Sequence, residues 1–419
     1  MENQTKRILI LTADAGFGHR SAANAVAAAL HELYGDVCRV EIVNPLEDKR
    51  TPAFLREIQS DYDRIVREMP ELYRMGFGAS DKLVTSAILE SALIPMLFEP
   101  LWDMVENYKP DTILTTFPIY QAPLTAVFSI KKVFTPFFTV ITDLSTIHRI
   151  WFHRKVDACF VPNEVVYSLG ASYGMPYRKM IVTGIPVNPL ITRERRSPSE
   201  LRTSLGWNTN LFTILAVGSR RVEGLTKILN LFNHYGAPIQ LVVVAGKDEE
   251  LYRELQQIEW HVPAHLYEYT DQMPIFMRAA DAIVCKAGGL TVTESLACGL
   301  PMMLINVIPG QETGNAEFVV SNGAGVLAED PVTALETLTH WLINNRALLK
   351  QQAKNAQRLG RPYAAYRVAR FLWRAAEHGV SDKTHKRING RSLLIKLLDQ
   401  SRIAWRKQIQ QVKSNKVNL

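Results

Sequence analysis

The chain has 419 residues, and 47% of them are hydrophobic, which is enough for two or three domains with packed cores. Its net charge of +7 is concentrated near one end: residues 381–419 carry ten Lys and Arg against two acidic residues, so this tail holds +8 and the remainder sums to −1. A body without excess positive charge disfavours a nucleic-acid-binding protein, because such domains usually have a basic face.

Cysteine usage and the N-terminal sequence indicate the compartment. Four scattered cysteines, without a C-x-x-C pair or paired histidines nearby, disfavour a zinc site and a disulfide framework and favour a reducing environment. The apolar run at 8–12 is too short for a signal-peptide core, and no stretch reaches the ~18 uninterrupted apolar residues of a membrane span. We therefore expect a soluble or peripheral cytoplasmic protein.

Short apolar runs alternate with helical patterns along the chain. In the first half we expect strands at 8–12, 39–43, 112–116, 138–142 and 158–162, with an alanine-rich helix at 21–34. In the second half we expect strands at 212–217, 239–245, 265–269, 282–286 and 302–306. This alternation predicts the α/β class, with two parallel sheets that carry helices on both faces. The polar, proline-containing segment 193–199 is the expected linker between the two Rossmann-like units.

The loop after the first strand contains Gly16, Gly18 and His19 and opens the first helix. As Gly-x-Gly-x-x-Ser it is a weakened dinucleotide fingerprint, and Glu41 stands where such folds place a ribose-binding acid. A dehydrogenase is therefore an alternative, but it lacks the third glycine and leaves residues 285–315 unexplained. His19 lies at a helix start, which favours its neutral form, so it is a candidate base. It could equally bind phosphate or order the loop.

A second polar group follows the expected strand at 138–142. Asp143, His148, Trp151 and His153 fall within eleven residues, at the strand end where parallel sheets present ligands. By count, the acid and the two histidines could bind a metal. Their i, i+5, i+10 spacing fits neither one helix face nor a familiar zinc pattern, so we expect no metal here.

Residues 285–315 are the most informative stretch. An apolar strand runs into Gly288 and Gly289, and a helix then begins at Leu290–Thr291. The free amides of a helix start attract phosphate, and Glu294 one turn further can accept hydrogen bonds from ribose hydroxyls. A second strand leads to the polar residues Gln311 and Glu312, which suit sugar hydroxyls. The two glycines alone could be an ordinary strand–helix turn, but the whole set suits a nucleotide-sugar.

This constellation resembles the donor half of glycosyltransferases of the B fold. It is most similar to the family of monogalactosyldiacylglycerol synthases and processive glucosyldiacylglycerol synthases, and more distantly to the peptidoglycan N-acetylglucosaminyl transferase. The series Thr142-Asp143-Leu144, His148 and Trp151-Phe152-His153 and the turn at 183–189 also resemble this family, so the likeness covers roughly residues 7–375. One departure is Lys286-Ala-Gly-Gly-Leu-Thr291, where plant-type galactolipid synthases read Lys-Ala-Gly-Pro-Gly-Thr.

The resemblance implies roles for individual residues. His19, Asp143 and His148 would be catalytic, with His19 or Asp143 as the base. Gly16, Gly18 and Trp151 would line the acceptor and phosphate loop. The donor would be held by Gly218, Ser219, Arg220, Met273, Gly288, Gly289, Leu290, Thr291, Glu294, Gln311, Glu312 and Asn315. One displacement by such a base would invert an α-linked donor to a β-glycoside, and no metal or other cofactor is expected.

The expected architecture follows from these assignments. An N-terminal domain at 1–195 would face the acceptor and the membrane, and a C-terminal domain at 200–360 would bind the nucleotide-sugar. Residues 361–380 would form a helix that crosses back to the first domain, and 381–419 a basic amphipathic tail. The predicted function is transfer of galactose or glucose from a UDP-sugar to diacylglycerol or glycosyl-diacylglycerol. The alternatives are N-acetylglucosamine transfer to a polyprenyl-linked or other lipid acceptor and a non-enzymatic nucleotide-sugar sensor.

Two segments suggest contact with an anionic membrane surface. The apolar residues within 54–108 lie where the resembling family contacts the bilayer; we expect most of them to pack against the sheet and about a third to contact the membrane. In the tail, a stripe that includes Trp405 is flanked by Lys and Arg, the pattern of a surface-membrane helix. A helix that docks on the protein or a nucleic-acid arm is the alternative. We expect a peripheral protein on the cytoplasmic face of the membrane, with no nucleic acid as partner.

Overall fold

The computed structural model describes residues 5–15, 17–57, 81–219, 222, 224–307 and 312–378. Several predicted features lie outside these residues: the tail at 381–419, part of the membrane segment at 58–80, and the site candidates Gly16, Arg220 and Gln311.

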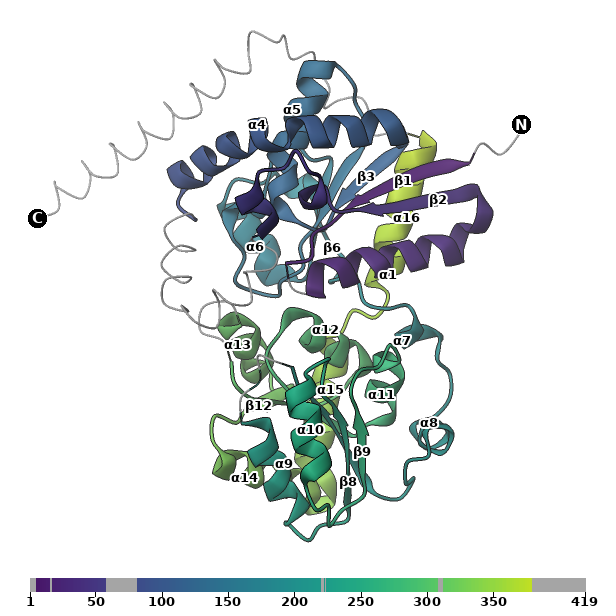
Figure 1. The fold of residues 1–419 in the computed structure, drawn as a ribbon, viewed down its shortest axis with the longest axis vertical. Helices are drawn as coiled ribbons and strands as arrows, with labels where there is room; N and C mark the ends of the chain where they lie inside the picture. Colours follow the sequence, from purple (N-terminus) through teal and green to yellow (C-terminus); the bar gives the residue numbers. More distant parts are fainter. Residues whose placement is uncertain are drawn as a thin grey trace, which may run out of the picture.

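The first half of the chain forms a parallel sheet of six strands in the order β2-β1-β3-β4-β5-β6 (Figure 1). The central strands are buried over their whole length, as expected for a sheet that helices cover on both faces. The strands are β1 (Lys6–Leu11), β2 (Cys38–Val43), β3 (Thr112–Thr115), β4 (Phe137–Val140), β5 (Ala158–Val161) and β6 (Met180–Val182).

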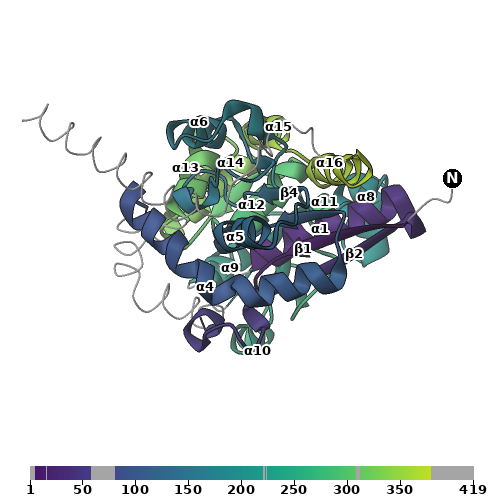
Figure 2. The same cartoon turned by 90° about the horizontal axis from the view of Figure 1, so that it is seen from above.

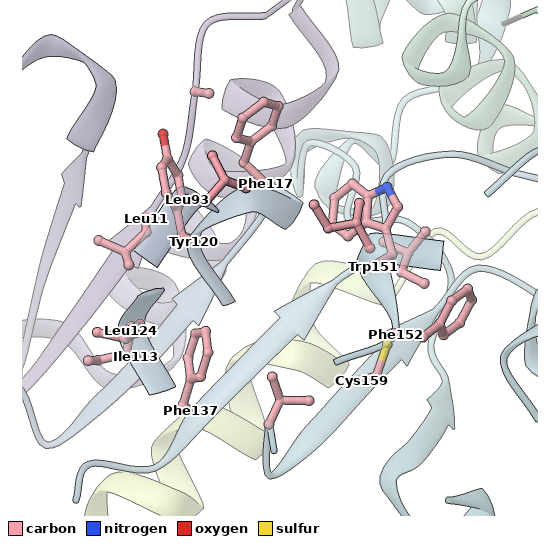
Figure 3. Packing of buried hydrophobic residues seen from close by; sticks show 14 of the residues in the cluster. Leu11, Leu93, Ile113, Phe117, Tyr120, Leu124, Phe137, Trp151, Phe152 and Cys159 are labelled. Atoms are coloured by element: carbon pink, nitrogen blue, oxygen red, sulfur yellow. The ribbon is translucent and has the colours of Figure 1, made fainter. Parts of the chain in front are cut away.

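Helices from both ends of the chain cover this first sheet. On one face, α1 (Phe17–Tyr34) packs with α16 (Ala364–His378), so the last described helix completes the core of the first half. On the other face lie α4 (Leu83–Tyr108), α5 (Gln121–Lys131) and α6 (Glu164–Ser172). Figure 3 shows the packing on this second face, where Leu93 of α4 and Leu124 of α5 join Tyr120, Phe137 and Trp151.

The second half forms another parallel sheet of six strands, in the order β12-β11-β10-β7-β8-β9. Its strands are β7 (Phe212–Val217), β8 (Ile239–Val244), β9 (Ala264–Tyr267), β10 (Ala282–Cys285), β11 (Met302–Leu304) and β12 (Gly325–Leu327). The prediction of an α/β fold with two parallel sheets is therefore confirmed.

Helices cover both faces of this second sheet as well. One face packs against α8 (Pro198–Leu205), α11 (Met273–Ala279), α12 (Gly289–Cys298) and α15 (Ala347–Leu359). The other packs against α9 (Leu225–Asn233), α10 (Glu249–Gln257) and α14 (Pro331–Leu342). Two further helices, α7 (Leu190–Arg193) and α13 (Thr313–Ser321), lie near the boundary between the halves (Figure 1).

Sequence signals at several helix starts explain where these helices begin. Ser197 caps α8 and forms a reciprocal capping box with Glu200, while Asp248 caps α10 and Asp330 caps α14. Each of these side chains satisfies backbone amides that would otherwise have no partner. The start of α12 differs from these. Its N-cap residue is Gly288, and no described side chain caps the helix.

The chain crosses between the halves twice, and glycine allows the crossings to pack closely. Gly184, after β6, has a φ of +90°, and a β-carbon there would lie 2.3 Å from the Cβ of Arg361, just before α16. Near the same boundary, Tyr366 of α16 donates a hydrogen bond to Glu32 of α1 at 2.9 Å, and Arg193 of α7 lies 3.6 Å from the same carboxylate oxygen. The second crossing therefore returns the chain to the first half.

Helix α4 is unusually apolar on its exposed side. Within the part of the chain that the structure describes, α4 is the one helix long and apolar enough, by length and composition only, to span a membrane. Its C-terminal part packs on the sheet through Leu93, Leu97 and Leu101, whereas Ile88 in its N-terminal part is 63% exposed. Figures 1 and 2 show α4 lying across the outer side of the first half, away from the second half.

The crossing at Gly184 predicts a stability difference between two glycine substitutions. Gly184→Ala should destabilise the protein through both backbone strain and the clash with Arg361, whereas Gly206→Ala should cause strain alone. Gly206 has a φ of +72°, and no described atom lies within 4 Å of the β-carbon position. We expect a loss of about 1–2 kcal/mol at Gly206 and a further ~1–3 kcal/mol at Gly184, measured by chemical denaturation. Equal losses would show that Arg361 moves aside at no cost.

Candidate active site

The candidate site lies where the loop after β4 meets the first turn of α12. A β-carbon on Gly289, the first residue of α12, would lie 3.2 Å from the backbone carbonyl of Thr142 and 3.5 Å from a carboxylate oxygen of Asp143. In both sheets these loops follow the carboxyl ends of parallel strands, the edge at which such sheets bind ligands. Figure 1 shows α1 and α12 on opposite sides of this boundary. The fold therefore brings the predicted acceptor and donor segments together.

His19, in the first turn of α1, is held by two groups of the first half. Its Nδ1 lies 2.9 Å from the carbonyl oxygen of Thr116 and 2.9 Å from the hydroxyl of Thr142. A carbonyl can only accept a hydrogen bond, so the contact with Thr116 places the ring proton on Nδ1 and leaves the lone pair on Nε2. The ring also contacts Phe117, with centroids 4.9 Å apart, and lies 6.0 Å from Trp151.

Burial keeps His19 neutral. It lowers the pKa of His19 to about 4, although the hydrogen bond with Thr116 acts in the opposite direction. At neutral pH the imidazole is therefore unprotonated and can accept a proton at Nε2, as a general base requires.

Asp143 and Glu294 are the two carboxyl groups at the boundary with raised pKa values. Burial raises the pKa of Asp143 to about 6 and that of Glu294 to about 7. Asp143 faces Gly289, whereas Glu294 lies in the second turn of α12 and is 9% exposed. Desolvation is the cause of the raised pKa of Glu294, and its carboxylate oxygens can accept bonds from ligand hydroxyls.

The start of α12 has the properties of an anion site. Gly288 to Thr291 are partly exposed, and no described side chain caps the helix. The first amides point out of the helix start, where the macrodipole is equivalent to about half a positive charge. A diphosphate bound there would meet backbone donors. The ammonium of Lys286 adds a cation 3.0 Å from the position that a β-carbon on Gly288 would occupy.

Two predicted donor-binding residues, Glu312 and Asn315, have protein partners in the structure. Glu312, which is 3% exposed, forms an ion pair with Lys286. Asn315 donates to the carbonyl of Ala287 at 3.0 Å and accepts from the amide of Leu144 at 3.4 Å. Asn315 thus ties the loop before α12 to the loop after β4. Its geometry favours a role in joining the two halves over the predicted role in donor binding.

His148 has a different environment from the predicted catalytic one. Its Nδ1 accepts a hydrogen bond from the amide of Ile150 at 3.1 Å and caps a short 3-10 helix, Arg149–Trp151. The proton is then on Nε2, which lies 3.9 Å from a carboxylate oxygen of Asp81. With Nδ1 engaged in this way, the geometry of His148 favours a role in shaping the loop over the predicted catalytic role.

The other predicted residues are distributed around the same boundary. Gly18 lies in the first turn of α1, and Trp151 is buried in the core of the first half beside His19 (Figure 3). Gly218 and Ser219 follow β7, where a β-carbon on Gly218 would clash with Leu251, and Met273 begins α11. Among the described residues, no group of three or more His, Cys, Asp and Glu is arranged to hold a metal ion, so Asp143, His148 and His153 do not form one.

Sequence reasoning missed the two residues that hold His19. Thr116 contributes a backbone carbonyl, which leaves no residue-type signal. Thr142 directly precedes Asp143 at the end of a predicted strand, and this position could have indicated that Thr142 belongs to the site. The sequence motif at 286–291 contains Lys286 but does not predict a role for it. Its ammonium lies beside Gly288 only because of the way the loop folds.

Comparison with known proteins agrees with this arrangement. Residues 19–187 match the model of monogalactosyldiacylglycerol (MGDG) synthase, and residues 216–368 match the glycosyltransferase family 28 C-terminal domain. Monogalactosyldiacylglycerol synthase 3 of Arabidopsis thaliana is 34% identical over 382 residues, which cover 88% of this chain and 81% of the relative. The chain belongs to the monogalactosyldiacylglycerol synthase family. The spinach (Spinacia oleracea) synthase is 31% identical, over 88% of this chain and 72% of its own.

Solved structures confirm the B fold for this member of the synthase family. Acinetobacter baumannii MurG superposes with a TM-score of 0.57 at 15% identity, over 88% of this chain and 99% of MurG. The S. aureus MnaA–UDP co-structure gives a TM-score of 0.57 at 16% identity, over 90% and 98% of the two chains. At this identity the likeness concerns the fold alone. Together with the synthase relatives it shows that the protein is a glycosyltransferase.

The relatives contradict the predicted cytoplasmic location. The synthases of Arabidopsis thaliana, spinach and soybean (Glycine max) are named as chloroplastic, so the family does not support a cytoplasmic protein on the cytoplasmic face. The prediction of a cytoplasmic location was based in part on the four free cysteines. Free cysteines indicate a reducing environment, but they do not distinguish one reducing compartment from another.

The raised pKa of Glu294 predicts a pH dependence of donor binding. If the carboxylate accepts bonds from the ribose, affinity should fall as pH decreases through about 7, because the neutral acid is a weaker acceptor. Glu294→Gln is uncharged throughout, so it should weaken UDP-sugar binding about tenfold or more at pH 8 and remove most of the pH dependence. Calorimetry with UDP-glucose and UDP-galactose at pH 6 and 8 measures both effects. Wild-type affinity in the variant would exclude the ribose assignment.

Proposed function

We propose that the protein transfers a hexose, galactose or glucose, from a UDP-sugar to diacylglycerol or glycosyl-diacylglycerol with inversion at the anomeric carbon. The observation that carries the proposal is the juxtaposition of two groups across the boundary. A neutral histidine with its lone pair on Nε2 lies on one side, and an uncapped helix start that suits a diphosphate lies on the other. Family membership supports a lipid acceptor, since the relatives are named for diacylglycerol products. The choice of UDP rests on the family resemblance.

The proposed reaction is a single displacement. The Nε2 atom of His19 takes the proton from the acceptor hydroxyl while that oxygen attacks the anomeric carbon. The bond between this carbon and the phosphate oxygen breaks, and the nucleoside diphosphate leaves with the bonding electrons. The amides at the start of α12 and the nearby Lys286 would stabilise the charge on the leaving group. The chain supplies these groups itself, so the proposed reaction uses no divalent metal.

Asp143 suits a positioning role better than that of the base. Its carboxyl lies beside Gly289, where an ionised acid would repel the diphosphate, and its raised pKa of about 6 reduces this repulsion. A neutral or partly protonated acid at this place can donate a hydrogen bond to a phosphate or sugar oxygen. We therefore assign the proton transfer to His19.

The exposed part of α4 supports work at a membrane surface. Leu83, Ile88 and Leu89 expose apolar side chains on the N-terminal part of α4, in the half that holds His19, and Phe54 is also exposed. A lipid acceptor must leave the bilayer far enough to reach His19, so an apolar face on the same half would bring the enzyme close to its substrate. The basic tail would add attraction to anionic headgroups.

A lipid product assay tests the proposed function directly. The protein is incubated with anionic liposomes that contain diacylglycerol and with UDP-galactose, UDP-glucose or UDP-N-acetylglucosamine, and the extracted lipids are analysed by mass spectrometry and NMR. We expect a β-linked hexosyl-diacylglycerol from one of the two hexose donors, and equal activity in EDTA. Absence of any glycolipid, an α-linked product or strict dependence on Mg²⁺ or Mn²⁺ would contradict the proposal.

His19→Ala tests the assignment of the base. We expect turnover to fall by about two orders of magnitude or more, while UDP-sugar binding by calorimetry stays close to wild type. Asp143→Asn should cause a smaller loss. If the losses are reversed, Asp143 is the base and His19 is the positioning residue.

A further inference from the structure

Thr142 links the candidate base to the donor helix. Its side-chain hydroxyl lies 2.9 Å from Nδ1 of His19, and its backbone carbonyl lies 3.2 Å from the β-carbon position of Gly289. The residue itself is buried, one position before Asp143. One residue thus contacts the proton acceptor through its side chain and the expected diphosphate site through its main chain.

The hydroxyl has a particular use once His19 is protonated. In the neutral ring, the single proton on Nδ1 is directed to the carbonyl of Thr116, and the Thr142 oxygen is a second acceptor at the same distance. When Nε2 takes a proton, the ring becomes a cation and the Nδ1–H becomes a stronger donor. Two oxygen acceptors at Nδ1 then stabilise the charge that develops during the reaction.

The surroundings make this contribution important. Phe117 and Trp151 lie beside the ring, and burial lowers the pKa of His19, so the imidazolium has little help from water. Thr116 contacts the ring only through its main-chain carbonyl. The side-chain hydroxyl of Thr116 instead donates to the hydroxyl of Thr12 at 2.9 Å. Among the described residues, the side-chain hydrogen bond to the His19 ring therefore comes from the hydroxyl of Thr142.

We propose that Thr142 is a positioning residue that orients the His19 ring and stabilises its protonated form during sugar transfer. This inference rests on the proposed role of His19 as the base. It assigns to Thr142 an effect on turnover that acts through His19 and leaves donor binding unchanged.

The test compares three substitutions. Thr142→Val keeps the shape and removes the hydroxyl, so kcat should fall about tenfold while the KM for the UDP-sugar stays within about twofold. Thr142→Ser restores the hydroxyl and should recover most of the loss. Thr139→Val is the matched control: Thr139 lies on β4 three residues earlier, is equally buried, and its hydroxyl has no hydrogen-bond partner in the described part of the chain. Its removal should leave kcat unchanged.

A double-mutant cycle shows whether Thr142 acts through His19. In the His19→Ala background, Thr142→Val should cause no further loss, because the ring that it serves is absent. A wild-type kcat in Thr142→Val, or an equal loss with and without His19, would overturn the inference while leaving the proposed function intact. Normal turnover in His19→Ala alone would instead reject the proposed base and this inference with it.

Discussion

The close approach of the loop after β4 to the start of α12 is the contact on which the site depends. The glycine at residue 289 eases this approach, because a β-carbon there would make a tight contact of 3.2 Å with the carbonyl of Thr142 and would touch the carboxyl of Asp143. The contact sets the distance between the base on the first half and the anion site on the second. The side chain of Asn315 adds a second connection between the two halves, because it bonds to the main chain of Leu144 and of Ala287.

Desolvation has the same outcome for three of the titratable groups at this boundary. It lowers the pKa of His19 and raises those of Asp143 and Glu294, so each group is shifted towards its neutral form. A diphosphate that enters such a place meets less opposing negative charge from Asp143 and Glu294 than two fully ionised acids would give, and Glu312 is paired with Lys286. The free amides at the start of α12 can then act on the diphosphate directly. The arrangement suits a leaving group whose charge increases during the reaction.

The periodicity of the sequence was sufficient to predict the fold, and the motifs located much of the site. The expected strands at 212–217 and 239–245 correspond to β7 and β8, because long buried runs of β-branched residues have few other interpretations. The strands β6 and β12 were not predicted, since each has three residues and is stabilised by its neighbour in the sheet rather than by its own sequence. The partners of His19 come from residues 116 and 142, so they depend on tertiary structure. The same holds for the approach of Asp81 to the Nε2 of His148, because these two residues are far apart in sequence.

The return of α16 to the first half has a consequence for how the protein folds during synthesis. Ala365, Val368, Ala369 and Leu372 belong to the same core as Ile8, Ile10 and Val26. One face of the first sheet therefore lacks its full cover until the whole second half has left the ribosome. The two halves cannot fold as independent units in chain order, and until α16 arrives the apolar face of the first sheet is open to aggregation or to protection by a chaperone.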